Sequence, residues 1–225
     1  GGEKMDALSI DIDNVRGARR FGLFDTSTGD TARPDGEKKW HLVPRIQARM
    51  KGNDELEIAV PDGEWLPAFG MKATVALSGF LGFKAEIRSF RSRVDNDGKT
   101  DEPRYKAAPI HLLTTASLVR LKTLHPEGNP DPRRFRPNIL IDMPEIEGSF
   151  PETEWMGRRL TIGDVELTVA EPCRRCGFTI IAQDGIEEDA EILRNLVRHN
   201  GRNIGVYCTV ERPGDIAVSQ SLNLR

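Results

Sequence analysis

The sequence has little of what disulfide-bonded, membrane-spanning or nucleic-acid-binding proteins require. Three cysteines occur among 225 residues, and an odd number of thiols is more typical of a reducing compartment than of a secreted disulfide framework. No run of about 18 apolar residues is present, so no membrane-spanning helix is expected. The net charge of −3 provides no global positive field to attract nucleic acid or anionic lipid. These absences predict a soluble, cytoplasmic protein in which any anion site is local.

The N-terminus also lacks the features of a signal peptide. The opening residues, "GGEKMDALSIDIDN", contain neither a basic segment nor a following apolar segment. The chain begins at Gly1 rather than at a methionine, so a removed targeting segment can still have preceded it. At 225 residues the chain is long enough for one substantial core, with or without a smaller attached lobe.

Short strands outnumber helices in the predicted secondary structure. Period-two alternation at 5–12 and the Gly-Asp turn at 163–164 are typical of strands and strand pairs. The clearest helix is expected over 187–201, with acids in its first turn and a glycine at its end. A polar, turn-forming segment at 91–106 indicates a domain boundary. The predicted fold is mainly β, a β-barrel or curved sheet with peripheral helices. The predicted domains are a smaller N-terminal β lobe at 1–90 and a second domain at 105–225.

The stretch "EPCRRC" places two arginines between Cys173 and Cys176. A structural zinc site usually needs two close pairs of ligands, and Cys208 with four scattered histidines offers no second pair. A thioredoxin-like redox pair should begin a helix, whereas "GFTIIAQDG" predicts a strand and a turn. Burial as a small hydrophobe suits Cys208 but suits the other two poorly, because the adjacent arginines are costly to bury. The remaining interpretation is a thiolate beside cations, able to ligate a soft metal or to attack an electrophile.

Arginines recur in pairs elsewhere in the same half of the chain. Arg158 and Arg159 fit a solvated surface. The motifs "RRFRPN" at 133–138 and "CRRC" at 173–176 each adjoin an apolar strand. For these two motifs the sequence favours an anion site about as much as a solvated surface. Guanidinium groups bind phosphate through two parallel hydrogen bonds, so a cofactor that carries phosphate would satisfy them.

Four motifs, in order and spacing, resemble the MOSC domain family, named for the C-terminal domain of molybdenum cofactor sulfurases. They are "RRFRPNILID", W-x-G-x-x-L-x-I-G-D-V-E-L, P-C-x-R-C, and G-V-Y-x-x-V with a following "PGDI". The first half, with "GARRFGLFD" and "ALSGFLG", is similar to the β-barrel lobe that precedes this domain in many members. The resemblance covers nearly the whole chain and implies a MOSC-like barrel with a smaller N-terminal β lobe.

The resemblance also implies a cofactor and its ligands. Such proteins bind the molybdenum cofactor, a pterin dithiolene with a phosphate tail, and include the mitochondrial amidoxime reducing component and bacterial relatives. By similarity Cys176 is the catalytic thiolate on molybdenum, and Cys173 is not a ligand. Arg174 and Arg175 would face the phosphate or the pterin. The other implied cofactor contacts are Arg20, Arg136, Asn138 and Tyr207.

The activity implied by the resemblance is the reduction of a small N-hydroxylated compound by oxygen-atom transfer. Electrons would come from a separate ferredoxin-, flavodoxin- or cytochrome-type protein, since no ferredoxin-like cysteine cluster follows the domain. The alternatives are a carrier of molybdenum cofactor or sulfur, a pathway-specific MOSC protein without reductase activity, and a barrel without cofactor. Ala107 and Ala108 favour these alternatives, because amidoxime reductases have Thr-Ser at this point.

Overall fold

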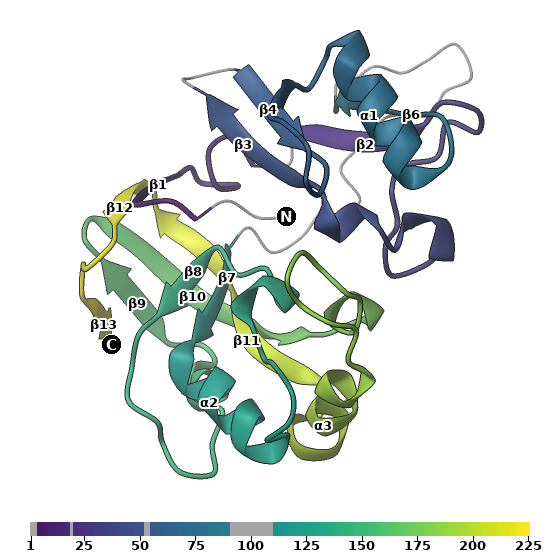
Figure 1. Cartoon of the computed structure of the whole chain (residues 1–225). Coiled ribbons are helices and arrows are strands. Elements are labelled where there is room, and N and C mark those ends of the chain that lie inside the picture. The colour runs from purple at the N-terminus through teal and green to yellow at the C-terminus, as the bar shows by residue number, and fades with distance from the viewer. Residues whose placement is uncertain (1–3, 19, 52–54, 91–109) are drawn as a thin grey trace. The chain divides into compact units, whose positions relative to one another are not determined.

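The computed structural model of the chain describes residues 4–18, 20–51, 55–90 and 110–225. The chain divides into two compact units (Figure 1). Of the described residues, unit 1 contains 20–51, 55–90 and 182–185, and unit 2 contains 4–18, 110–181 and 186–225. The predicted domain boundary at 91–106 lies outside the described residues, so the predicted domains stay a prediction. Ala107 and Ala108 lie outside them too.

Unit 1 consists of two small antiparallel sheets and one α-helix packed around Trp40, Ile58 and Leu77. The helix ends at Gly82, whose φ of 80° is the left-handed cap that glycine adopts without strain. The two-stranded sheet is β2 (Phe21–Asp25) with β6 (Ala85–Ser89). The three-stranded sheet is β3 (Gln47–Lys51), β4 (Glu55–Ala59) and β5 (Leu66–Pro67). The helices are η1 (Lys38–Trp40), η2 (Val43–Arg45) and α1 (Met71–Leu81).

Unit 2 is built on a curved six-stranded sheet in the order β13-β9-β10-β11-β7-β8 (Figure 1). All its pairs are antiparallel except β7 with β8. The strands are β7 (Ile110–Thr114), β8 (Ile139–Ile141), β9 (Arg159–Ile162), β10 (Val165–Arg174), β11 (Asn203–Arg212) and β13 (Leu222–Leu224). A separate pair joins β1 (Ala7–Ile10) to β12 (Gly214–Ala217). The predicted mainly β fold with few helices is confirmed.

The helices of unit 2 cover one part of this sheet. The two longest, α2 and α3, lie next to one another (Figure 1) and share a core with Phe135 and Phe150. The helices are α2 (Thr115–Leu124), η3 (Pro132–Arg134), η4 (Pro151–Trp155), η5 (Gly177–Thr179) and α3 (Ala190–Asn200). In the described part of the chain, no helix combines the length and the apolar character that crossing a bilayer requires.

The irregular end of β10 determines how the "CRRC" motif is presented. Val165, Leu167 and Val169 alternate into the core, but the register with β11 then shifts between Val169 and Glu171 and again between Pro172 and Arg174. Such bulges redirect side chains. After the bulges Cys173 is buried and Arg174 is exposed. The segment after Cys176 forms the short 3-10 helix η5, so the predicted strand there is wrong.

Close packing around Gly205 in β11 gives a first testable consequence. Gly205 has a φ of 76°, and a Cβ there would overlap the His111 ring and lie 2.8 Å from the Leu112 carbonyl oxygen. Gly157→Ala is the matched control, because Gly157 has a φ of 74° and no atom within 4 Å of a Cβ. We expect the control to lose about 1–2 kcal/mol of unfolding free energy. Gly205→Ala should lose about 1–3 kcal/mol of unfolding free energy more than the control. Urea unfolding measures both variants, and equal losses would contradict the close packing around Gly205.

Candidate functional site

Of the three cysteines, Cys176 is the one that is only partly buried. It directly precedes η5 with an extended backbone, φ −115° and ψ −176°. Its carbonyl oxygen accepts hydrogen bonds from the Thr179 amide at 3.2 Å and the Thr179 hydroxyl at 3.0 Å. Cys176 is half-buried, whereas Cys173 and Cys208 are 0% exposed. Cys176 is therefore the cysteine that can reach a ligand without opening of the core.

Arg175 points into the protein and holds Cys173. Its Nη1 donates to Cys173 Sγ at 2.6 Å, and its Nη2 donates to the Phe135 carbonyl oxygen at 2.8 Å. Its Nε is buried and has no hydrogen-bond partner. Its amide donates to the Arg202 carbonyl oxygen at 2.9 Å, and its carbonyl oxygen accepts from the side-chain Nε of Arg202 at 2.6 Å. The expectation that Cys173 suits burial poorly is wrong, because Arg175 is buried with it and has polar partners.

Arg133, Arg136 and Arg174 are the exposed residues among the arginines of the two predicted motifs, and Arg133 pairs with Asp131. Desolvation by the surrounding protein lowers the pKa of the Arg136 guanidinium. Arg174 is the last residue of β10. Arg136 has a φ of 52°, uncommon for a residue with a side chain, and its guanidinium carbon lies 5.8 Å from the centre of the Phe178 ring. Since Phe178 lies in η5, this contact brings Arg136 next to the helix that begins after Cys176. The predicted cofactor residues Arg136, Arg174 and Arg175 are thus gathered near Cys176.

Asn138 and Tyr207 both contact His111 of β7. The Asn138 side-chain oxygen accepts from the His111 amide at 2.8 Å, and the Asn138 amide donates to the His111 carbonyl oxygen at 2.8 Å. The Tyr207 ring, half-buried in β11, lies 5.5 Å from the imidazole between ring centres. His111 Nδ1 is 3.4 Å from the Arg136 carbonyl oxygen. His111 therefore connects three predicted cofactor residues, although its sequence context showed only an isolated histidine.

Burial keeps His111 neutral. Desolvation, with the nearby Arg175 guanidinium, lowers the pKa of His111 from 6.5 to about 3. The unfolded chain takes up this proton below pH 6.5 and the folded chain does not, so stability is complete above about pH 6.5 and falls as the pH drops toward 3.

We expect His111→Gln to flatten this acid dependence. Between pH 7 and pH 5 the wild-type unfolding free energy should fall by about 2 kcal/mol more than that of the variant, at up to about 1.4 kcal/mol per pH unit. Urea unfolding at the two pH values measures the difference. Parallel losses in both proteins would show that His111 is not buried in its neutral form.

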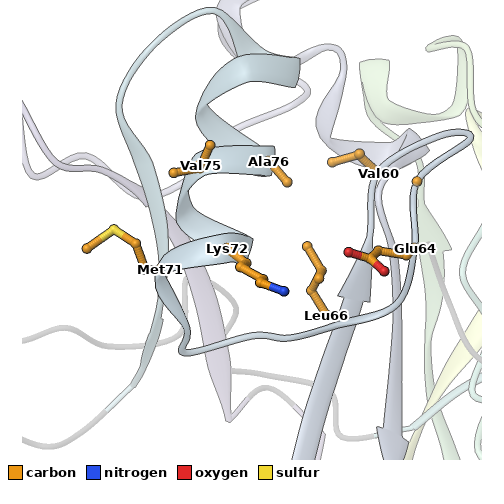
Figure 2. A pocket seen from close by; sticks show the side chains of 8 residues that line it. Val60, Glu64, Leu66, Met71, Lys72, Val75 and Ala76 are labelled. Carbon is orange, nitrogen blue, oxygen red and sulfur yellow. The ribbon is translucent and has the colours of Figure 1, made fainter.

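Arg20 lies in unit 1, exposed, with its guanidinium carbon 5.3 Å from the centre of the Phe21 ring. Its predicted contact with a cofactor stays a prediction. Unit 1 also has an open groove of about 410 Å³ (Figure 2). The groove is lined by Val60, Gly63, Glu64, Leu66, Met71, Lys72, Val75 and Ala76. None of the predicted site residues lines it, and its walls are mainly apolar.

The described residues contain no group of three or more His, Cys, Asp or Glu side chains that could hold a metal ion. A metal bound at Cys176 would therefore need most of its ligands from a cofactor. This donor set differs from that of a protein-built metal cage, which supplies three or four side chains. A partly buried cysteine beside guanidinium groups fits a metal that arrives inside an anionic organic ligand.

The three thiols should differ sharply in reactivity. Burial raises the pKa of the Cys208 thiol to about 12, and Cys173 is fully enclosed. We expect iodoacetamide at pH 7.5 to modify Cys176 in the native protein while Cys173 and Cys208 react only after denaturation. Peptide mass spectrometry over time gives the order of modification. Faster labelling of Cys173 than of Cys176 would contradict the described burial.

Comparison with known proteins gives a consistent set of relatives. A family model described as "MOSC domain" matches residues 93–223. The mitochondrial amidoxime reducing component 2 of Rattus norvegicus is 33% identical over 124 residues, which are 49% of this chain and 35% of that protein. The molybdenum cofactor sulfurase of Drosophila pseudoobscura pseudoobscura is 34% identical over 98 residues, 43% of this chain and 12% of that protein. The matched regions thus span about a third or less of these curated relatives.

Among solved structures, YiiM from Geobacillus stearothermophilus superposes with a TM-score of 0.40 and 16% identity, over 52% of this chain and 54% of that one. The YUAD protein from Bacillus subtilis has a TM-score of 0.40 and 13% identity, over 97% of this chain and 95% of that one.

Proposed function

Because this chain belongs to the MOSC domain family, we propose that it binds a molybdenum cofactor through Cys176 and reduces small N-hydroxylated compounds. The observation that carries the proposal is the accessible Cys176 thiol beside the exposed cations Arg136 and Arg174. Two relatives named mitochondrial amidoxime reducing component, at 33% and 30% identity, support the reductase activity.

The residues fit the chemistry of this cofactor. A dithiolene-bound molybdenum needs one soft protein ligand, which the Cys176 thiolate supplies. Its phosphate needs cationic donors, which exposed guanidinium groups supply bidentately. The Asn138 side-chain oxygen is engaged by the His111 amide, which leaves the Asn138 amino group to donate to a pterin.

When bound, the cofactor supplies the two-electron oxygen-atom transfer itself. The contribution of this chain is to bind and orient it: Cys176 through its sulfur, Arg174 and Arg136 through charge, and Tyr207 through its phenol. His111 does not act as an imidazolium acid near neutral pH, because burial lowers its pKa to about 3. Electrons would be delivered by a separate ferredoxin-, flavodoxin- or cytochrome-type donor protein.

The proposal is tested with the protein produced in a host that makes abundant molybdenum cofactor. Reduced methyl viologen serves as an artificial electron donor, and benzamidoxime or hydroxylamine serves as the substrate. We expect substrate-dependent oxidation of the viologen and formation of benzamidine or ammonia. Absence of turnover by protein that contains molybdenum would overturn the reductase activity while leaving cofactor binding intact.

A second candidate function is a carrier of molybdenum cofactor or of sulfur. It is favoured by the relatives named molybdenum cofactor sulfurase, which match at 33–34% identity. A carrier of sulfur would hold a persulfide on one cysteine, and Cys176 is the accessible candidate. Intact-protein mass spectrometry distinguishes the two: an added sulfur of about 32 Da without stoichiometric molybdenum favours the carrier.

A further inference from the structure

Two buried arginines connect the segments around the motifs "RRFRPN" and "CRRC": Arg175 reaches Phe135 of the first motif, and Arg134 reaches the chain that follows the second. We propose that Arg134 and Arg175 are positioning residues that hold these two segments together and so place the Cys176 thiol, with Cys173 as the acceptor that orients Arg175. The part of this inference that concerns the cofactor rests on the proposed function. The part that concerns the placement of Cys176 does not.

Arg134 reaches from the first motif to the segment that follows Cys176. It is 1% exposed and lies at the end of η3. Its Nε donates to the Asn129 carbonyl oxygen at 2.8 Å, and its Nη1 donates to the Thr179 carbonyl oxygen at 3.1 Å. Its Nη2 donates to the Glu187 carbonyl oxygen at 2.5 Å. The Arg134 fork thus ties η3 to two points of the chain after Cys176.

Arg175 reaches in the reverse direction, from the second motif to the first. Its hydrogen bond to the Phe135 carbonyl oxygen ends on the residue that follows Arg134. The Arg175 guanidinium carbon also lies 5.7 Å from the centre of the Phe135 ring. Cys176 therefore lies between two anchors, Arg175 on one side and Thr179 on the other. With both anchors fixed, the backbone that carries the thiol has little freedom to move.

The partners of both side chains argue against a direct role in binding phosphate. Among the described residues, neither guanidinium has a carboxylate partner within ion-pair distance, and the acceptors are backbone carbonyls and one thiol. Both side chains are buried, whereas Arg136 and Arg174 are exposed. A planar fork with several donors can join separate carbonyl groups, which the single ammonium of lysine cannot do with the same geometry.

This arrangement also gives Cys173 a role. Its sulfur is the acceptor for Arg175 Nη1, and that hydrogen bond directs the fork so that Nη2 meets the Phe135 carbonyl oxygen. Cys173→Ala removes the acceptor and leaves Arg175 Nη1 buried without a partner. Cys173→Ser keeps an acceptor of similar size at the same position. The two substitutions therefore separate the hydrogen bond from the volume of the side chain.

The test measures the iodoacetamide reactivity of Cys176 in cofactor-free protein. The variants are Arg134→Lys, Arg175→Lys, Cys173→Ala and Cys173→Ser, and the matched control is Arg133→Lys, whose exposed guanidinium pairs with Asp131. Near-ultraviolet circular dichroism establishes which variants are folded. Among folded variants, we expect the alkylation rate of Cys176 to change several-fold in Arg134→Lys, Arg175→Lys and Cys173→Ala. It should stay near the wild-type value in Cys173→Ser and in the control.

Unchanged alkylation rates in every folded variant would overturn the inference and leave the two arginines with a purely structural role. If the arginine variants do not fold, the comparison of Cys173→Ala with Cys173→Ser tests the inference. Equal alkylation rates of Cys176 in these two variants would overturn the positioning role. In a cofactor-producing host, the same three variants should retain molybdenum about 10- to 100-fold less tightly. If the wild type takes up no molybdenum while the alkylation rates respond, the proposed function fails and the positioning role stands.

Discussion

Replacing Cys176 with alanine is expected to reduce the rate of N-hydroxy reduction to that of the uncatalysed background. The substitution removes the accessible thiol among the three cysteines. The molybdenum would then lack its protein ligand, and both retention of the cofactor and its reactivity should suffer. Viologen oxidation in the presence of benzamidoxime measures the loss, on protein from a host that makes the cofactor.

Cys208→Ala is the matched control for this substitution. Cys208 is a buried thiol of β11 in the same unit, and it pairs across the sheet with Ile110 and Val169. Its loss removes a small apolar side chain from the core but no accessible thiol. We expect the folded control to keep its activity. Equal activity of Cys176→Ala and Cys208→Ala would mean that neither thiol is the metal ligand.

Replacing Glu152 with alanine is expected to destabilise unit 2 by about 3–5 kcal/mol. This carboxylate of η4 is fully buried, and its Oε2 accepts from the Thr114 hydroxyl at 2.7 Å and the Ser117 hydroxyl at 2.6 Å. Its Oε1 accepts from the Gly205 amide at 2.9 Å. The substitution would leave three buried donors without an acceptor.

Urea unfolding compares Glu152→Ala with two other variants. Glu154→Ala is the matched control, because Glu154 lies in the same short helix and is exposed; its loss should change the unfolding free energy by less than about 0.5 kcal/mol. Glu152→Gln keeps one acceptor oxygen and should fall between the two. A loss in Glu152→Ala no larger than that in the control would contradict the buried network.

Local sequence patterns predicted much of unit 2. The helix expected at 187–201 corresponds to α3, which begins later, at Ala190, after Asp189 accepts from the Glu191 amide at 3.0 Å, and which ends at Gly201 with a φ of 55°. The acids at 187 and 188, expected in its first turn, precede the helix. The turn expected at 163–164 joins β9 to β10. These features depend on neighbouring residues, so propensity, capping and period-two alternation are sufficient to reveal them.

These local patterns could not predict which distant segments pair with one another. The pairing of β1 with β12 joins residues near the two ends of the chain. The parallel pairing of β7 with β8 follows the crossover through α2. The role of Glu152 depends on Thr114, Ser117 and Gly205, which are far from it in sequence. Only the folded chain brings such donors to one acceptor.

Within the candidate site, the sequence likewise could not predict which arginines are buried. The sequence placed Arg174 and Arg175 together as partners of an anion, but bulges at the end of β10 expose the first and bury the second. Arg134 attracted no separate hypothesis, yet it is among the most buried side chains of the protein. A sequence pattern locates a cluster of cations, while the packing of the strand end decides which cations face solvent.

The most direct test of cofactor binding through Cys176 is the molybdenum and pterin content of the protein purified from a cofactor-producing host. Elemental analysis gives the metal per chain, and oxidation of the pterin to its fluorescent form gives the organic part. We expect about one of each per chain in the wild type and much less molybdenum in Cys176→Ala. Wild-type protein free of molybdenum, while a reference molybdenum enzyme from the same cells is fully loaded, would contradict cofactor binding.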